Sequence, residues 1–411
     1  MACGRDSSAR DGAARMSDEP LWMSAKQASA ALGVSVPTLY AYVSRKLVRS
    51  QNVQGSRRRR YWKGDIDRLR GEQDAIESTG DPSGLNNETG ITLLTERGLY
   101  YRGKNAVDLA ETETFESVAA LLWDADVQAV FTGQVPAVPA SYAKLKRNLE
   151  DLTGAERVLA LLPMIERANP RLYDLSKAGI ARAGADITRW CAAIVTDAKG
   201  PSAAPLHEFI VASLNGAPAF ADLVRRLLIL AADHEFDPTT FAVRAVANAG
   251  ITPCYAVMTG LIVSGGQRLQ VGRAWAVSRF LDEIVSSSSP RDCIVARFRS
   301  GEPLPGYSLP RNKNWDPRAA AMMRAVAASF GDDPAFKRLR SASDTALEIG
   351  GFRPDFIVPA TFIGRQLGLK GQELAIASLG RIAGWIAHAM EQYHAHDLIR
   401  PRAKYVGALP S

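Results

Sequence analysis

From residue 89 onward, apolar residues recur every three or four positions in segments that short Gly- and Pro-rich turns separate. The spacing is clearest in residues 115–122, 155–165, 217–232 and 374–392. It is the period of a helix with one buried face, whereas a half-buried strand would alternate at every second residue. The best candidate for a short strand is residues 93–102. The spacing therefore predicts an all-α body.

An uncharged stretch from residue 245 to residue 267 contains Asn248, Thr252 and Pro253 with several glycines, and it indicates a helix buried in protein rather than a membrane span. The N-terminus has no continuous apolar core after its basic residues, so we expect no secretory signal. The 4 cysteines lie far apart without a CxxC pair. We therefore expect a soluble cytoplasmic protein without a disulfide framework or a metal site.

Positive charge is concentrated near the N-terminus. The formal net charge is +7, and residues 1–71 hold 14 Lys and Arg against 6 Asp and Glu, which leaves the remainder almost neutral. Residues 22–63 contain 9 basic residues and no acidic one. A small basic unit joined to a near-neutral body suggests a polyanionic partner for that unit.

Composition also marks the borders of the basic unit. Residues 1–20 are rich in Ser, Ala, Gly, Arg and Asp without apolar periodicity, so we expect them to be disordered. Residues 71–88 have the composition of a polar linker. Residues 21–70 between these two segments would form a domain of their own.

The domain begins with the pattern of two helices joined by a tight turn. Ser24 is suited to cap a helix over residues 25–32, and Gly33 supplies the turn that follows. Ser35 is suited to cap a second helix. A turn at residues 52–55 then leads into a run of four arginines followed by Tyr and Trp.

This domain resembles the winged helix-turn-helix of MerR and excisionase-like regulators, in which the second helix enters the major groove and the wing contacts the backbone. A run of charge alone is more often a solvated edge, but its combination with an acid-free pair of helices favours DNA binding, with the arginines contacting phosphates. The candidate DNA-binding residues are Tyr40, Arg45, Lys46, Arg57, Arg58, Arg59 and Arg60.

Several phrases of the body resemble the citrate synthase family and occur in the same order. They are residues 98–103 (GLYYRG), 231–236 (AADHEF), 316–319 (DPRA), 381–392 (RIAGWIAHAMEQ) and 400–407 (RPRAKYVG). The resemblance implies a citrate synthase fold, with a large helical domain of residues 89–269 and 359–411. A small domain of residues 270–358 would close over the cleft.

The resemblance also implies a reaction. The family condenses an acyl-CoA, such as acetyl-CoA or propionyl-CoA, with oxaloacetate and then hydrolyses the thioester, without a bound cofactor. A carboxylate removes a proton from the acyl group, one imidazole stabilises the enolate, and a second imidazole polarises the ketone.

The positions that bind the dicarboxylate in the family are filled in this chain. By resemblance, Arg318, Arg381 and Arg400 bind substrate carboxylates, for which a planar guanidinium is well shaped, and His234 is the substrate-binding histidine. In the family the last of these arginines reaches the partner's site, which implies a homodimer. Singly, each residue would indicate an ordinary ion pair or a core histidine. Four matches in register favour a retained pocket for oxaloacetate or citrate.

The catalytic positions depart from the family pattern. Asp355 aligns with the catalytic base, although Arg353 and Pro354 before it differ from the pattern. The family phrase SGPLHGGA is replaced here by SGGQRLQVGR, so Gln270 takes the position of the enolate-stabilising histidine. Leu309 takes the position of the second histidine.

A glutamine amide can still donate a hydrogen bond, but a leucine side chain can neither donate one nor transfer a proton. Each loss is expected to cost roughly two to three orders of magnitude in rate, although losses within one catalytic unit need not multiply. We therefore expect weak or absent turnover. Three functions stay open: a synthase whose lost roles are covered otherwise, a carboxylate sensor that controls the DNA-binding domain, and a non-catalytic partner of an active paralogue.

Overall fold

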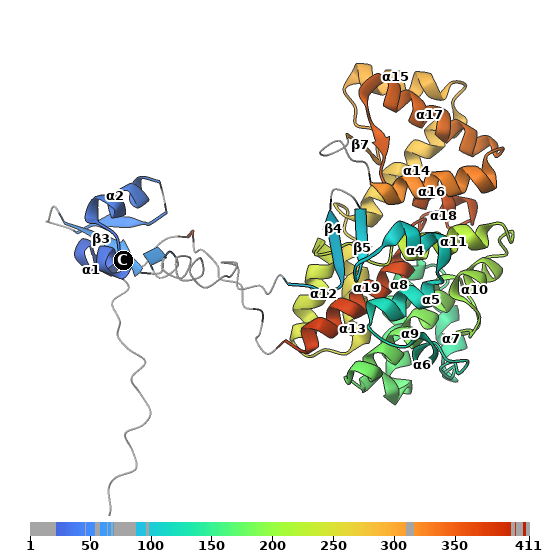
Figure 1. The fold of residues 1–411 in the computed structure, drawn as a ribbon, viewed down its shortest axis with the longest axis horizontal. Helices are drawn as coiled ribbons and strands as arrows, with labels where there is room; N and C mark the ends of the chain where they lie inside the picture. Colours follow the sequence, from blue (N-terminus) through green and yellow to red (C-terminus); the bar gives the residue numbers. More distant parts are fainter. Residues whose placement is uncertain are drawn as a thin grey trace, which may run out of the picture. The chain divides into compact units, whose positions relative to one another are not determined.

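The computed structural model describes residues 22–45, 47–53, 58–63, 65–66, 69, 88–95, 98–309, 316–395, 399 and 406–407. By its internal contacts the chain divides into two compact units, residues 1–88 with 399–411 and residues 89–398 (Figure 1). The predicted disordered segment and nearly all of the predicted linker lie outside the described residues.

The first unit combines two short helices with a small sheet. Its elements are β1 (Trp22–Ser24), α1 (Ala25–Ala31), α2 (Val36–Ser44), β2 (Ser50–Asn52) and β3 (Arg59–Trp62). The strands are antiparallel in the order β1-β3-β2. Ser24 and Ser35 cap the two helices, as their sequence pattern predicts, and Ser24 forms a capping box with Gln27. A separate small core of apolar side chains closes the unit: Ala28, Leu32, Leu39, Val48, Tyr61 and Ile66.

The second unit begins with a three-stranded antiparallel sheet. Its strands are β4 (Thr92–Thr95), β5 (Gly98–Tyr101) and β6 (Lys104–Asn105), in that order. The prediction of a single strand over residues 93–102 is wrong. The segment forms two antiparallel strands, because the chain reverses between Thr95 and Gly98, which pair with each other. Gly98 has a φ of 150°, a conformation that costs glycine little.

Most of the body is helical. The helices before residue 265 are α4 (Ala106–Thr112), α5 (Phe115–Leu122), α6 (Val127–Val130), α7 (Tyr142–Arg147), α8 (Gly154–Ala168), the 3₁₀-helix η1 (Pro170–Tyr173), α9 (Lys177–Val195), α10 (Leu206–Ser213), α11 (Phe220–Leu230), α12 (Pro238–Asn248) and α13 (Pro253–Ser264). The last helix, α19 (Ala375–Tyr393), packs against α9, α11, α12 and α13 and is buried on most sides. The four segments with the clearest helical spacing all form helices, which confirms that part of the prediction.

The uncharged stretch 245–267 contains two helices instead of the single one expected. Helix α12 ends at Asn248, and Thr252 precedes α13. Pro253 suits the first position of a helix but has no N–H to continue an earlier one, which explains the break. None of the described helices is long and apolar enough to cross a membrane.

The remaining helices gather at one side of the body (Figure 1). They are α14 (Gln270–Ser286), α15 (Pro290–Ser300), α16 (Pro317–Phe330), α17 (Pro334–Gly350) and α18 (Ile357–Gln366), with a ribbon of β7 (Tyr307–Ser308) and β8 (Arg353–Pro354). Helix α14 packs on α17 and α18, and α15 packs on α17. The predicted small domain begins where α14 begins, but its predicted end at Val358 falls inside α18. The division into a large and a small domain stays a prediction.

Candidate functional site

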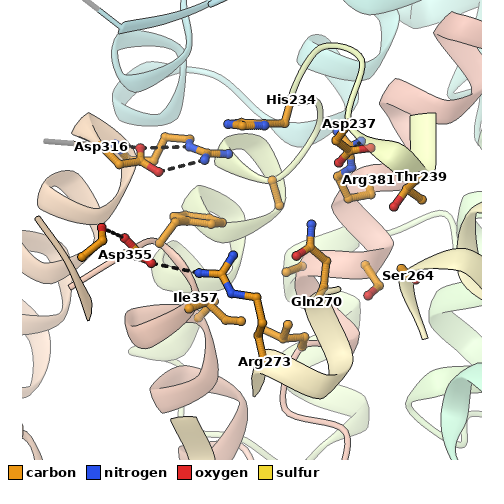
Figure 2. A pocket seen from close by; sticks show the side chains of 18 of the residues that line it. His234, Asp237, Thr239, Ser264, Gln270, Arg273, Asp316, Asp355, Ile357 and Arg381 are labelled. Carbon is orange, nitrogen blue, oxygen red and sulfur yellow. Dashed lines mark hydrogen bonds and ion pairs between the residues drawn. The ribbon is translucent and has the colours of Figure 1, made fainter. Parts of the chain in front are cut away.

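A cavity of about 680 Å³ opens among α12, α14, α16, α18 and α19 (Figure 2). Segments that are distant in the sequence meet here. The cavity is lined by every predicted site residue of the body that the structure describes: His234, Gln270, Leu309, Arg318, Asp355 and Arg381. The last predicted residue of this set, Arg400, lies outside the described residues.

Arg381 is held by two aspartates, of which Asp237 lines the cavity and Asp233 is buried behind it. It donates to Asp233 Oδ1 at 2.9 Å, to Asp237 Oδ2 at 3.1 Å and to Thr240 Oγ1 at 2.7 Å. Three of its five N–H groups are thereby used, and the other two have no partner within the described part of the chain. Gly384 permits this approach, because a Cβ there would lie 2.3 Å from Asp233 Oδ1.

Arg318 lies in the first turn of α16 and forms a bidentate ion pair with Asp316, the N-cap residue of this helix. Its Nε and Nη2 lie 3.1 and 2.8 Å from the two oxygens of Asp316. Its guanidinium carbon is 4.8 Å from the centre of the Phe356 ring. The Nη1 group has no partner among the described residues, so it can bind an anion in the cavity.

His234 lines the cavity together with these two arginines (Figure 2). The charge of Arg318, burial of the ring and the charge of Arg381 lower its pKa to about 4. The ring is therefore neutral at pH 7, where it offers one N–H donor and one nitrogen acceptor to a ligand.

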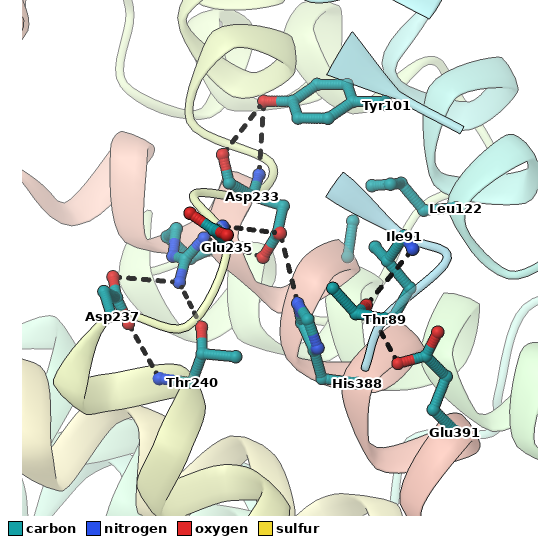
Figure 3. A network of polar contacts seen from close by, with 12 residues as sticks. Thr89, Ile91, Tyr101, Leu122, Asp233, Glu235, Asp237, Thr240, His388 and Glu391 are labelled. Atoms are coloured by element: carbon teal, nitrogen blue, oxygen red, sulfur yellow. Dashed lines mark hydrogen bonds and ion pairs between the residues drawn. The ribbon is translucent and has the colours of Figure 1, made fainter. Parts of the chain in front are cut away.

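Asp233 anchors Arg381 from inside the core (Figure 3). Its Oδ2 lies 3.1 Å from His388 Nε2. The Tyr101 hydroxyl donates to the backbone oxygen of Asp233 and accepts from the Asp233 N–H, both at 3.2 Å. Burial by itself would raise the pKa of Asp233, but the charges and hydrogen bonds of His388 and Arg381 outweigh burial and hold the pKa well below its ordinary value. Asp233 is therefore an ionised anchor for the arginine.

A chain of polar contacts continues from His388 to the first residues of the body. Arg244 Nη1 lies 3.3 Å from His388 Nδ1 and 2.7 Å from Glu391 Oε2. The carboxylate of Glu391 accepts from the Thr89 hydroxyl at 2.9 Å and from the Gly90 N–H at 2.8 Å. The site is thus connected to the beginning of β4 by side chains that are mostly buried.

Asp355 follows β8, and both of its carboxylate oxygens are occupied. Oδ2 accepts from Arg273 Nη2 at 2.9 Å, and Oδ1 accepts from the Ser308 hydroxyl. Its backbone N–H donates to Gly306 O at 2.7 Å. Neither Arg273 nor Ser308 was among the site residues predicted from the sequence. One available signal was that Arg273 stands three residues after Gln270 in a helix, which places both on one face.

The two positions at which the sequence predicts replaced histidines both line the cavity. Gln270 is the first residue of α14, and Leu309 follows β7 with 55% of its surface exposed. Within the described residues, His234 is the only imidazole of the lining, and no three His, Cys, Asp or Glu side chains converge as a metal site. The cavity thus offers guanidinium groups and one neutral imidazole, but no imidazole beside Asp355.

The candidate DNA-binding residues belong to the first unit. The exposed side chain of Tyr40 lies on α2, and Arg45 ends that helix. On β3, Arg59 donates to Asn52 at 3.1 Å, and Arg60 donates to Gln51 at 3.1 Å. Arg58 is exposed next to β3, whereas Lys46 and Arg57 lie outside the described residues. DNA binding by these residues stays a prediction.

The family model described as "Citrate synthase, C-terminal domain" matches residues 84–402. The chain belongs to the citrate synthase family. Among citrate synthase relatives, "Citrate synthase 2" of Bacillus subtilis is 24% identical over 365 residues, which cover 82% of this chain and 95% of that protein. The 2-methylcitrate synthase of Shewanella oneidensis is 26% identical over 382 residues, with 82% and 97% covered.

Solved citrate synthase structures share the fold. The enzyme from Pyrobaculum aerophilum superimposes with a TM-score of 0.67 at 20% identity and covers 82% of this chain and 93% of its own. The Thermoplasma acidophilum enzyme, solved with carboxymethyl coenzyme A and oxaloacetate, gives a TM-score of 0.64 at 19% identity, with 80% and 95% covered. The prediction of a predominantly helical citrate synthase fold is confirmed.

Proposed function

We propose that the body binds a di- or tricarboxylate and has weak or no synthase turnover. One observation carries this proposal: Arg318, Arg381 and His234 face the cavity with free hydrogen-bonding groups, while both oxygens of Asp355 are already bonded. A carboxylate ligand would find donors on two guanidinium groups and on the imidazole.

The same geometry opposes proton abstraction from an acyl-CoA. Asp355 keeps one lone pair on each oxygen beside its bonds to Arg273 and Ser308, so it can accept a proton only from the directions that these two partners leave open. The enolate formed would then have only the amide of Gln270 as a side-chain donor in place of an imidazole, and Leu309 offers the ketone nothing.

Turnover and binding are tested separately. Thiol release from acetyl-CoA and from propionyl-CoA with oxaloacetate is measured for the wild type and for a Gln270→His, Leu309→His double variant. Thermal shift with oxaloacetate and with citrate is measured for the wild type and for Arg381→Ala. We expect no appreciable thiol release from the wild type, together with a ligand-induced stabilisation that Arg381→Ala abolishes. Wild-type turnover at the rate of ordinary synthases would refute the proposal.

A second function, DNA binding by residues 21–70, is supported by the charges on β3. Arg59 and Arg60 bond to uncharged side chains and, among the described residues, to no acidic one. We expect a 30-base-pair duplex to bind, and Arg59→Gln, Arg60→Gln to reduce the slope of log K against log salt by about 2. The exposed pair Arg324→Gln, Arg340→Gln removes the same charge from the body and should leave the slope unchanged. Equal effects of the two double variants would contradict a specific role for β3.

Assembly into a homodimer is supported by exposed apolar side chains on two neighbouring helices. Phe241 on α12 and Tyr255 and Ile262 on α13 are exposed in the single chain. Ile262→Lys should therefore shift the sedimentation of the protein from dimer toward monomer. Mixed oligomers on co-expression with an active paralogue would instead support the role of a partner subunit.

A further inference from the structure

Arg273 brings a third guanidinium group to the cavity. It lies in the first turn of α14, on the same face as Gln270, and both side chains point into the cavity (Figure 2). Its one hydrogen-bonding partner in the described part of the chain is Asp355. Since a guanidinium carries five N–H groups, four remain for a ligand.

The pair of Arg273 and Asp355 is open to solvent. The arginine side chain is 49% exposed and the aspartate side chain is 25% exposed. Ion pairs exposed to this degree contribute little to stability, because water screens the attraction and two flexible side chains must be ordered. The guanidinium can therefore exchange the carboxylate of Asp355 for that of a ligand at small cost, while Ser308 still bonds to Asp355.

The other two guanidinium groups are positioned differently. Arg318 and Arg381 are largely buried and are fixed by Asp316 and by Asp233 with Asp237. Together with His234 they form one fixed wall of the cavity, whereas Arg273 extends into the cavity from α14 (Figure 2). A ligand with two carboxylates can be held by the wall alone, and a third carboxylate would reach Arg273.

We infer that Arg273 recognises a third carboxylate, so that the cavity prefers tricarboxylates to dicarboxylates. This inference rests on the proposed carboxylate pocket and names its ligand class. Arg273 is a specificity-determining residue: its bond to Asp355 is replaced by a bond to the third carboxylate of the ligand. The amide of Gln270 is a neighbouring donor.

Two ligands with one carbon skeleton test the inference by calorimetry on the full chain. Propane-1,2,3-tricarboxylate has one carboxylate more than glutarate and is otherwise the same molecule. We expect the wild type to bind the tricarboxylate at least about tenfold more tightly, as one added charged hydrogen bond allows. Arg273→Gln should weaken the tricarboxylate about 10- to 100-fold and change glutarate less than about threefold.

A second variant tests the exchange itself. Asp355→Asn removes the competing charge without changing the volume, so it should bind the tricarboxylate more tightly than the wild type and give a smaller gain for glutarate. Equal effects of Arg273→Gln on both ligands, or weaker tricarboxylate binding in Asp355→Asn, would overturn the inference. If Arg381→Ala abolishes binding while Arg273→Gln changes nothing, the proposed pocket stands and this inference falls. If neither ligand binds the wild type, both fall.

Discussion

His388 Nε2 lies 3.1 Å from Asp233 Oδ2, and neither side chain is exposed to solvent. The other ring nitrogen faces Arg244, whose guanidinium can only donate. His388 therefore donates from Nε2 to Asp233. Asp233 in turn fixes Arg381. A buried histidine that touches no ligand thus orients the arginine that faces the cavity.

Replacing this histidine should destabilise the body. His388→Ala removes one of the two donors to Oδ2 of an ionised, buried Asp233 and leaves only the N–H of Glu235, so we expect a loss of about 2 kcal/mol in the free energy of unfolding. Urea unfolding followed by circular dichroism gives this value. His394→Ala, at an exposed position on the same segment, should change it by no more than about 0.5 kcal/mol. Similar losses in the two variants would show that Asp233 does not depend on His388.

The pH dependence of stability should report on His234. Its pKa is lowered from 6.5 to about 4 in the folded chain, so the unfolded chain binds a proton first as the pH falls. Stability should therefore decrease between pH 6.5 and about 4, by about 1.4 kcal/mol per pH unit for this group. His234→Gln should have a flatter profile over that range. Parallel profiles for the two proteins would contradict a neutral His234.

Gly384 should tolerate no side chain. The Cβ of Gly384→Ala would fall 2.3 Å from Asp233 Oδ1 and 2.4 Å from the backbone oxygen of Ala232. We expect a loss of about 1 to 3 kcal/mol in the free energy of unfolding together with weaker citrate binding, because Arg381 loses its fixed position. Gly133→Ala is a matched control, since nothing lies within 4 Å of its added Cβ. Unchanged citrate affinity in Gly384→Ala would separate Asp233 from the ligand site.

The contact between Glu391 and Gly90 should be visible in amide hydrogen exchange. Glu391→Ala removes the acceptor of the Gly90 N–H, so that amide should exchange about 10- to 100-fold faster. Glu348→Ala breaks an exposed ion pair with Arg291 and should leave Gly90 unchanged. Protection of Gly90 that persists in Glu391→Ala would mean that another group anchors this segment.

Much of the architecture could be predicted from local patterns. Helices such as α5 and α19 carry a clear apolar period and lie within a residue of their expected limits. Short-range geometry was harder, because the reversal between Thr95 and Gly98 and the break before Pro253 depend on a few backbone conformations inside apolar segments.

The site could be predicted in part for a different reason. Arg318, Arg381 and His234 belong to recognisable phrases of the sequence, and all three line one cavity, although their roles stay a prediction. The pairing of Arg273 with Asp355 spans 82 residues and was not found. No local pattern specifies such a contact, because it arises only when α14 and the segment after β8 pack together.

Glu391 binds Thr89 and Gly90 near the end of the last helix of the body. The first residues of the body are therefore held by hydrogen bonds to the body's own last helix, whatever precedes residue 89. A module can be gained, exchanged or lost at this point over evolutionary time without the body losing its closing contact. The contact that fixes the start of the body therefore does not depend on the first unit.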